Sequence, residues 1–232
     1  MPRPAFIPHR PPRIPIEETQ ARARAFYEQM DARRSVRMFS PDPVPRSVVD
    51  DLIRTASTAP SGAHRQPWRF VIVGDAATKA AIRDAAEAEE RENYRGGRLP
   101  PDWLEALEPL GTDERKPYLE IAPWLVVLFE ERYGVNPDGS RRKNFYVKES
   151  VGIAAGLFIT AVHNAGLATL PHTPSPMVFL SQVLQRPENE RAFALFPVGY
   201  PADDCEVPDL RRKSLGEVVA EPRGGAELVN GL

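Results

Sequence analysis

A short basic cluster near the N-terminus combines residue types that bind phosphate. It consists of Arg33, Arg34, Ser35, Val36 and Arg37. A guanidinium group is a planar fork that binds phosphate oxygens in pairs, and the serine hydroxyl adds a neutral donor. The cluster therefore has the chemistry to hold one phosphomonoester. The alternative is a solvated basic turn.

A carboxylate, a phenol and an ammonium group lie around one glycine- and proline-rich segment. Glu90 and Tyr94 are four residues apart in a predicted helix, so they share a face. Lys116 follows the segment. If the fold places Lys116 opposite the helix, the three side chains form a cage for a zwitterion. Three unrelated surface positions are the alternative.

The turn Pro60-Ser61-Gly62-Ala63-His64 is a further candidate, because its glycine lets backbone N–H groups approach a ligand closely. Ser61 and His64 could also form a nucleophilic pair. That chemistry requires a third group to orient the base and an oxyanion motif, and the sequence supplies neither. An ordinary loop is the alternative.

Composition excludes several classes of protein. The 232 residues carry 30 basic and 32 acidic side chains, a net charge of −2 that does not fit a nucleic-acid partner. Four scattered histidines and one cysteine, Cys205, give no metal-ligand spacing. The single cysteine is also typical of a cytoplasmic protein. Dinucleotide-binding, P-loop and nucleophile-elbow motifs are absent.

The elements that must position these residues alternate along the chain. Periodicity predicts helices over residues 17–30, 48–56, 75–94 and 151–166, and strands over 69–73, 124–129, 167–170 and 192–198. The class is α+β or α/β, with a small sheet covered by helices. We expect residues 124–129 to form a central strand, because they are almost all apolar.

The remaining segments complete the organisation. Residues 1–16 form a Pro/Arg-rich arm, 17–220 one domain and 221–232 a tail, with a flap at about 94–116. The apolar run Val151 to Leu170 is long enough to span a bilayer, but His163 and Asn164 interrupt it. We expect a core or interface helix and no membrane association.

Several separated motifs, in order, resemble a known family. Arg33 to Arg37 and Ala59 to His64, followed by Gln66-Pro67-Trp68, resemble the opening of the flavin-dependent nitroreductases. Other segments are similar to the iodotyrosine deiodinase family within that superfamily: Glu90 to Tyr94, Lys116 to Leu119, Asn164 to Leu167, Pro197 to Pro201 and Val207 to Lys213. The similarity covers about residues 17–220.

The resemblance implies an FMN protein with a mixed sheet, working as an intertwined homodimer with its sites at the subunit interface. It implies that Thr173 is the catalytic residue, with its hydroxyl hydrogen-bonded to flavin N5. It also implies a set of cofactor-binding residues: Arg33, Arg34, Ser35, Val36, Arg37, Ser61, Pro171, His172, Thr173 and Arg212. Family members carry a run of threonines where this chain has Pro171-His172-Thr173.

For the substrate, the resemblance implies that Glu90, Tyr94 and Lys116 grip the ammonium and carboxylate groups of a halotyrosine. The backbone of Ala63 would meet its phenolate oxygen. The expected reaction is FMN-dependent reduction of 3-iodo-L-tyrosine and 3,5-diiodo-L-tyrosine to L-tyrosine and halide. The electron donor is not identified, and is either NAD(P)H or a reductase. The alternatives are an NAD(P)H-dependent nitroreductase or quinone reductase, and a non-catalytic flavin or amino-acid binding protein.

Overall fold

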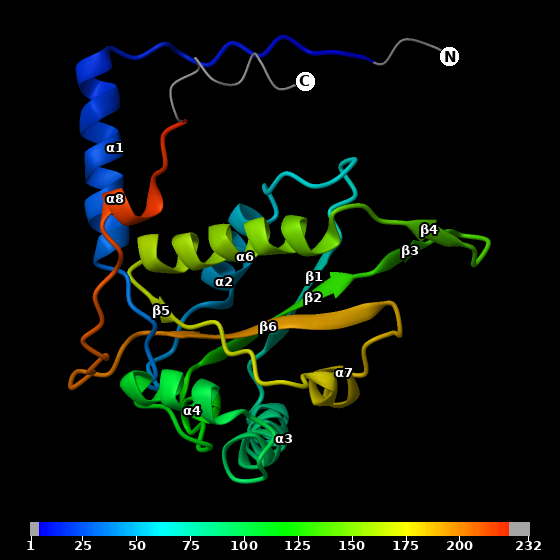
Figure 1. The fold of residues 1–232 in the computed structure, drawn as a ribbon. Helices are drawn as coiled ribbons and strands as arrows, with labels where there is room; N and C mark the ends of the chain where they lie inside the picture. Colours follow the sequence, from blue (N-terminus) through cyan, green and yellow to red (C-terminus); the bar gives the residue numbers. More distant parts are fainter. Residues whose placement is uncertain (1–4, 223–232) are drawn as a thin grey trace, which may run out of the picture.

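The computed structural model describes residues 5–222 and contains a four-stranded sheet with helices on both faces (Figure 1). All strand pairs are antiparallel. A parallel pairing is present only as a single bridge between Ser35 and Thr169, so the sheet is mixed only at that point among the described residues. The strand order is β1 (Trp68–Val73), β2 (Trp124–Glu131), β6 (Glu190–Gly199) and β5 (Ala168–Thr169).

Strand β2 is internal in the sheet and buried on both faces, as its apolar run predicted. Val126 and Leu128 pack into one hydrophobic cluster, whereas Leu125 and Val127 pack into the other. All four side chains are fully buried. Successive strand residues point to opposite faces, so an unbroken apolar run is what a strand between two helical layers requires.

The two faces are covered by different helices (Figure 1). One face carries α2 (Arg46–Ala56) and α6 (Val147–Asn164). The other carries α3 (Ala76–Tyr94), α5 (Tyr118–Ile121) and α7 (Val178–Val183). Helix α6 begins before the predicted Val151, because a polar first turn precedes the apolar run.

Helix α3 begins where the sequence indicated. The Asp75 carboxylate accepts a hydrogen bond of 2.8 Å from the backbone N–H of Thr78, which is an N-cap interaction. The chain after α3 is not continuous loop: it contains α4 (Pro101–Leu107) and the 3₁₀ turn η1 (Glu108–Leu110). Pro101 occupies the first turn of α4, where its missing N–H costs nothing.

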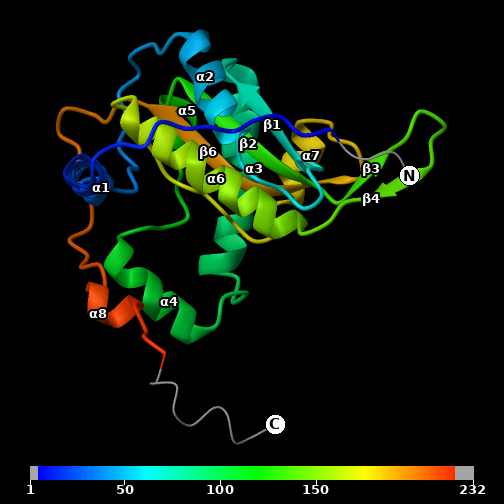
Figure 2. The same cartoon turned by 90° about the horizontal axis from the view of Figure 1, so that it is seen from above.

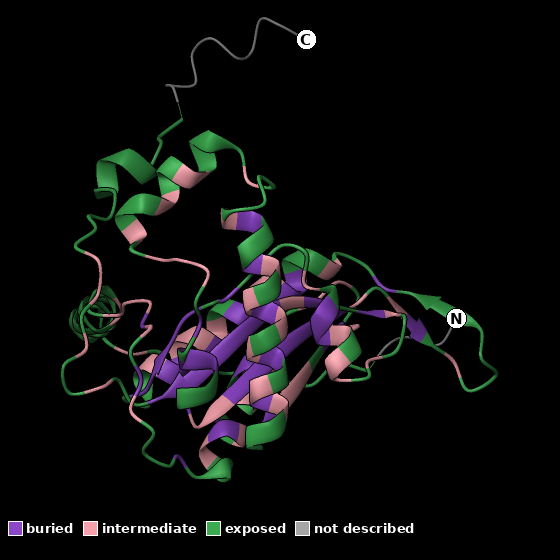
Figure 3. Cartoon of the chain, turned by 90° about the horizontal axis from the view of Figure 1, so that it is seen from below, coloured by how far each residue is buried: buried purple, intermediate pink, exposed green. Residues whose placement is uncertain are grey.

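Several elements project from this three-layer body of helices, sheet and helices. Helix α1 (Ile16–Asp31) has no buried residue and lies at one side, as Figures 2 and 3 show. The hairpin of β3 (Tyr133–Val135) and β4 (Arg141–Lys143), and the short α8 (Leu215–Val218), were not predicted. Residues 5–15 have no regular secondary structure, and most of the tail at 221–232 lies outside the described residues. No helix in residues 5–222 has the length and apolar character to cross a bilayer.

Candidate active site

The basic cluster is held against the edge of the sheet. The Val36 N–H donates to the Thr169 carbonyl at 3.3 Å, and Ser35 bridges Thr169, so the cluster runs beside β5. The C-terminal segment folds back over it. Both segments line a hollow of about 280 Å³. Its basic and hydroxyl side chains are Arg33, Arg34, Ser35, Arg37, Arg211 and Arg212.

Positive charge in this hollow is not fully neutralised. Arg212 bonds Asp31 Oδ1 at 3.0 Å and the Arg33 carbonyl at 2.5 Å, and Arg34 donates to the Pro208 carbonyl. The Arg33 and Arg37 guanidinium groups make no hydrogen bond or ion pair within residues 5–222. Burial, followed by the charges of Arg212 and Arg34, lowers the pKa of Arg33. Such a cluster attracts an anion.

The second part of the site is a cavity of about 190 Å³ beneath the flap. Glu90 and Tyr94 lie one turn apart on α3, and Lys116 faces them from just before α5. The structure therefore brings the predicted cage residues together, and Arg37 and Thr173 line the same cavity. Only 8% of Glu90 and 2% of Lys116 is exposed.

Glu90 and Lys116 are oppositely charged and buried, yet within residues 5–222 they form no ion pair. Lys116 Nζ donates to Thr112 Oγ1 at 3.2 Å and to the Asp113 carbonyl, and lies 5.5 Å from the Tyr94 ring centroid. An ammonium group has three donors, so one remains for a ligand. Burial raises the pKa of Glu90, against the effect of Lys116. Burial also lowers the pKa of Lys116, against the effect of Glu90.

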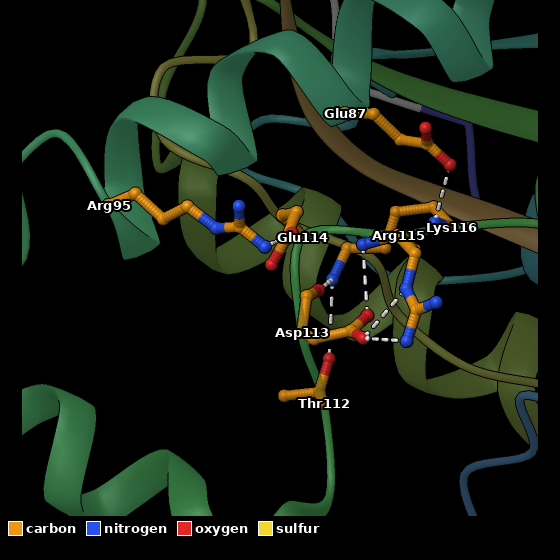
Figure 4. A network of polar contacts seen from close by, with 7 residues as sticks. All are labelled: Glu87, Arg95, Thr112, Asp113, Glu114, Arg115 and Lys116. Carbon is orange, nitrogen blue, oxygen red and sulfur yellow. Dashed lines mark hydrogen bonds and ion pairs between the residues drawn. The ribbon is translucent and has the colours of Figure 1, made fainter.

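A polar network fixes the segment that carries Lys116 (Figure 4). The backbone N–H of Lys116 donates to Glu87 Oε1 at 2.7 Å. Asp113 pairs with Arg115 at 2.9 Å, and Glu114 pairs with Arg95 at the end of α3. These contacts join the C-terminal part of the flap to α3, and so place the ammonium group opposite Glu90.

Apolar side chains form another part of the cavity wall. Sequence reasoning assigned none of them to the site, although the apolar spacing after Pro101 was visible in the printed sequence. They face the polar cage from the flap and from the end of β5, a combination that fits an aromatic ring with polar substituents. They are Leu99, Trp103, Leu107, Leu110 and Leu170.

Residues 171–173 alternate between two environments. Pro171 and Thr173 are exposed, whereas His172 is buried. The His172 ring turns to Tyr118, with Tyr118 Oη 3.3 Å from Nδ1. Alternate residues of extended chain point to opposite sides, so the His172 ring packs against Tyr118, while His172 still lines the flap cavity together with Pro171 and Thr173. Sequence reasoning gave Tyr118 no role.

Ser61 and Ala63 lie away from this cavity within the chain. Their turn packs at the start of α6, where the Gly62 N–H donates to Ser150 Oγ at 3.2 Å. The Ser61 hydroxyl accepts from the Gln66 N–H at 2.9 Å, and the His64 ring contacts the Gln66 side chain at 3.1 Å. The His64 backbone N–H donates to the Ser61 carbonyl at 3.0 Å, but the two side chains form no hydrogen bond with each other, so the nucleophilic pair is not formed.

Comparisons with known proteins agree with this geometry. The Nitroreductase family matches residues 30–200. An iodotyrosine deiodinase of Haliscomenobacter hydrossis is 55% identical over 217 residues, which cover 94% of this chain and 97% of that protein. One of Danio rerio is 44% identical over 92% of this chain and 72% of its own. The chain belongs to the nitroreductase family, in its iodotyrosine deiodinase branch.

Solved structures agree with this membership. An iodotyrosine deiodinase bound to FMN and 3-iodo-L-tyrosine superposes with a TM-score of 0.74 at 29% identity, over 86% of this chain and all of that one. A Bacteroides thetaiotaomicron protein described as a putative NADH dehydrogenase/NAD(P)H nitroreductase gives 0.60 at 22% identity, over 86% of this chain and 98% of that one, and supports the fold alone. The nitroreductase-like fold, with helices covering a small sheet, is thus confirmed, and the strands of this sheet pair antiparallel.

Proposed function

We propose that this protein uses FMN to remove halogen reductively from halotyrosines. The observation that carries the proposal is that Glu90 and Lys116 are buried on opposite sides of one cavity, lined also by Thr173, and form no ion pair within residues 5–222. A buried carboxylate and a buried ammonium group that lack an ion-pair partner are costly unless a ligand supplies both counter-charges. An α-amino acid supplies both, whereas nitroaromatics and quinones supply neither.

The arginine hollow fits the phosphate of FMN, because Arg33 and Arg37 lack counter-ions among the described residues. Arg34, Ser35 and Arg212 complete that set, and the Val36 backbone holds it against β5. Arg37 lines both the hollow and the flap cavity, so it is the cation available to the flavin ring. Thr173 and the backbone of residues 171–172 border the same cavity. When bound, FMN supplies the electrons.

The cage residues orient the amino acid. In this proposal the Glu90 carboxylate accepts hydrogen bonds from the substrate ammonium, and Lys116 donates to the substrate carboxylate. Tyr94 adds a hydroxyl donor. The apolar side chains of the flap, among them Trp103 and Leu107, cover the aromatic ring and exclude water.

The overall reaction takes up two electrons and one proton, breaks one carbon–halogen bond, forms one carbon–hydrogen bond and releases halide. Thr173 lines the cavity, and we propose that its hydroxyl donates a hydrogen bond to the flavin ring and has the catalytic role. A fixed positive charge at Arg37 favours negative charge that develops nearby, and a site closed to water strengthens that effect.

We further propose that the protein works as a cytoplasmic homodimer in which the partner supplies the turn with Ser61 and Ala63. Within one chain this turn does not reach the cavity. Exposed apolar residues lie on α6 and on the unburied α1, among them Ile153, Phe26 and Tyr27. They support an interface at these helices. The electron donor is either NAD(P)H or a reductase protein.

The decisive experiment is anaerobic. The purified flavoprotein is reduced chemically and mixed with 3-iodotyrosine while flavin absorbance, iodide and tyrosine are followed. We expect reoxidation with one iodide and one tyrosine per flavin. Reoxidation by a nitroaromatic but not by iodotyrosine would instead support a nitroreductase, and tight binding without turnover would support a binding protein.

A further inference from the structure

His172 and Tyr118 form a buried pair beneath the flap cavity. Tyr118 Oη lies 3.3 Å from His172 Nδ1, and the rings meet edge to face at 6.0 Å and 83°. Only 4% of Tyr118 and 6% of His172 is exposed. No other hydrogen bond of either side chain is formed within residues 5–222.

The number of unsatisfied donors and acceptors decides which of the two groups donates in this hydrogen bond. If the Tyr118 hydroxyl donates to Nδ1, one buried group, the Nε2–H of His172, has no partner among the described residues. If Nδ1–H donated instead, both the Tyr118 proton and the Nε2 lone pair would be unsatisfied. Because each unsatisfied buried group is costly, the first arrangement is favoured. His172 is then neutral and carries its proton on Nε2.

The surroundings keep both rings neutral. Burial, followed by the charges of Lys116 and Arg37, lowers the pKa of His172 to about 3. Burial, together with Glu90, Tyr94 and Asp113 and against Arg37, raises the pKa of Tyr118 well above its ordinary value. The contact is thus a hydrogen bond between neutral groups at physiological pH.

The pair connects the two halves of the site through the chain. Tyr118 follows Lys116 by two residues, and His172 immediately precedes Thr173. The backbone of His172 is also fixed, because its N–H donates to the Leu195 carbonyl at 2.8 Å and its carbonyl accepts from the Leu195 N–H at 3.0 Å. The position of Thr173 therefore depends on a residue anchored at three points.

We propose that His172 is a positioning residue, and that its hydrogen bond with Tyr118 couples the segment carrying Lys116 to the placement of the Thr173 hydroxyl. The inference rests on the proposed function for the role of Thr173. The geometry of the pair itself does not depend on it. A threonine at position 172 is too short to span the gap to Tyr118 that the imidazole bridges.

The pair is tested first by ¹⁵N NMR of the histidine rings in the FMN holoprotein, which has only four histidines to assign. We expect His172 to remain a neutral Nε2–H tautomer from about pH 8 down to about pH 5, and to lose this single tautomer in Tyr118→Phe. A proton on Nδ1, or a charged ring in that range, overturns the proposal. This readout needs no turnover, so it separates failure of the pair from failure of the proposed function.

The coupling is tested by a double-mutant cycle between Tyr118→Phe and Thr173→Ala. With Thr173 present, loss of the Tyr118 hydroxyl should lower kcat about tenfold, the size of one hydrogen bond, with little change in KM. With Thr173→Ala the same change should have almost no further effect. Equal effects in both backgrounds would show a merely structural role. If iodotyrosine is not a substrate, the cycle is run with a nitroaromatic.

Matched variants complete the design. Tyr133→Phe removes a hydroxyl that makes no hydrogen bond within residues 5–222, and should leave kcat unchanged. His172→Asn keeps an acceptor near the Nδ1 position and should restore most of the rate, whereas His172→Leu should not. If Tyr118→Phe fails to fold, the His172→Asn and His172→Leu pair carries the test, and equal rates for these two would overturn the proposal.

Discussion

The arginine hollow and the flap cavity share Arg37 but differ in the sign and the burial of their charged side chains. The hollow gathers several half-exposed guanidinium groups of one sign. The cavity buries one carboxylate and one ammonium, held apart. Several positive charges near solvent favour an anionic group and accept some variation in its position. A buried pair of opposite charges favours a zwitterion whose two charges have the matching separation. If the hollow binds the cofactor and the cavity binds the substrate, as we propose, variants in one region should affect one of the two affinities and leave the other unchanged.

The largest effect should come from the buried cage. Lys116→Ala removes the positive charge that acts on the buried Glu90 carboxylate, and with it the group that we propose binds the substrate carboxylate. We expect a loss of about 2 to 5 kcal/mol in 3-iodotyrosine binding. Titration of the oxidised flavoprotein measures this. The FMN content should be unchanged. If the variant loses affinity for FMN and for 3-iodotyrosine to a similar extent, the two regions do not act as separate binding sites.

The arginine hollow should respond next. Arg33→Ala removes one charged donor and should weaken FMN binding by about 1.5 to 3 kcal/mol, more at low salt than at high salt. Equilibrium dialysis of apoprotein with FMN measures it. Arg54→Ala is the matched control, because Arg54 is exposed and paired only with Asp51. If Arg33→Ala binds FMN like the control, this hollow does not hold the phosphate.

Acid should weaken substrate binding in the cavity through protonation of Glu90. Burial raises the pKa of Glu90 above its ordinary 4.5. As the pH falls, the Glu90 carboxylate, which we propose accepts hydrogen bonds from the substrate ammonium, is thus protonated at a higher pH than an exposed glutamate. Below that pKa, affinity for 3-iodotyrosine should fall by up to about tenfold per pH unit. Glu90→Gln should bind weakly but without this acid limb. Protonation of 3-iodotyrosine itself affects its binding to the unsubstituted protein and to Glu90→Gln equally, so it cancels when the two pH profiles are compared.

The smallest effect should come from the rim of the flap. Arg95 pairs with Glu114 but is 73% exposed, so the ion pair should contribute at most about 1 kcal/mol. Arg95→Ala should therefore change the dissociation constant of 3-iodotyrosine less than about fivefold, and still less at high salt. A loss above tenfold would mean that this ion pair holds the flap closed.

The sequence predicted much of the fold because local signals were strong. The apolar run from Trp124 to Phe129 predicted a strand that is covered on both faces, and Asp75 predicted the start of α3. The hairpin of β3 and β4 was missed because its strands have three residues each, too short for a periodic pattern. The apolar lining of the flap was missed because side chains such as Trp103 acquire a role only when a cavity forms above them.

The sequence alone determined which chemical groups are present: the arginines at 33, 34, 37 and 212, and the Glu90–Tyr94 spacing that fixes one helix face. Only the tertiary structure decided how they meet. Residues 26 positions apart, Glu90 and Lys116, face each other because the flap returns to α3 through contacts such as Glu87 with the Lys116 N–H. Likewise, His172 turns inward because its backbone pairs with Leu195, an interaction between distant segments that no local pattern encodes.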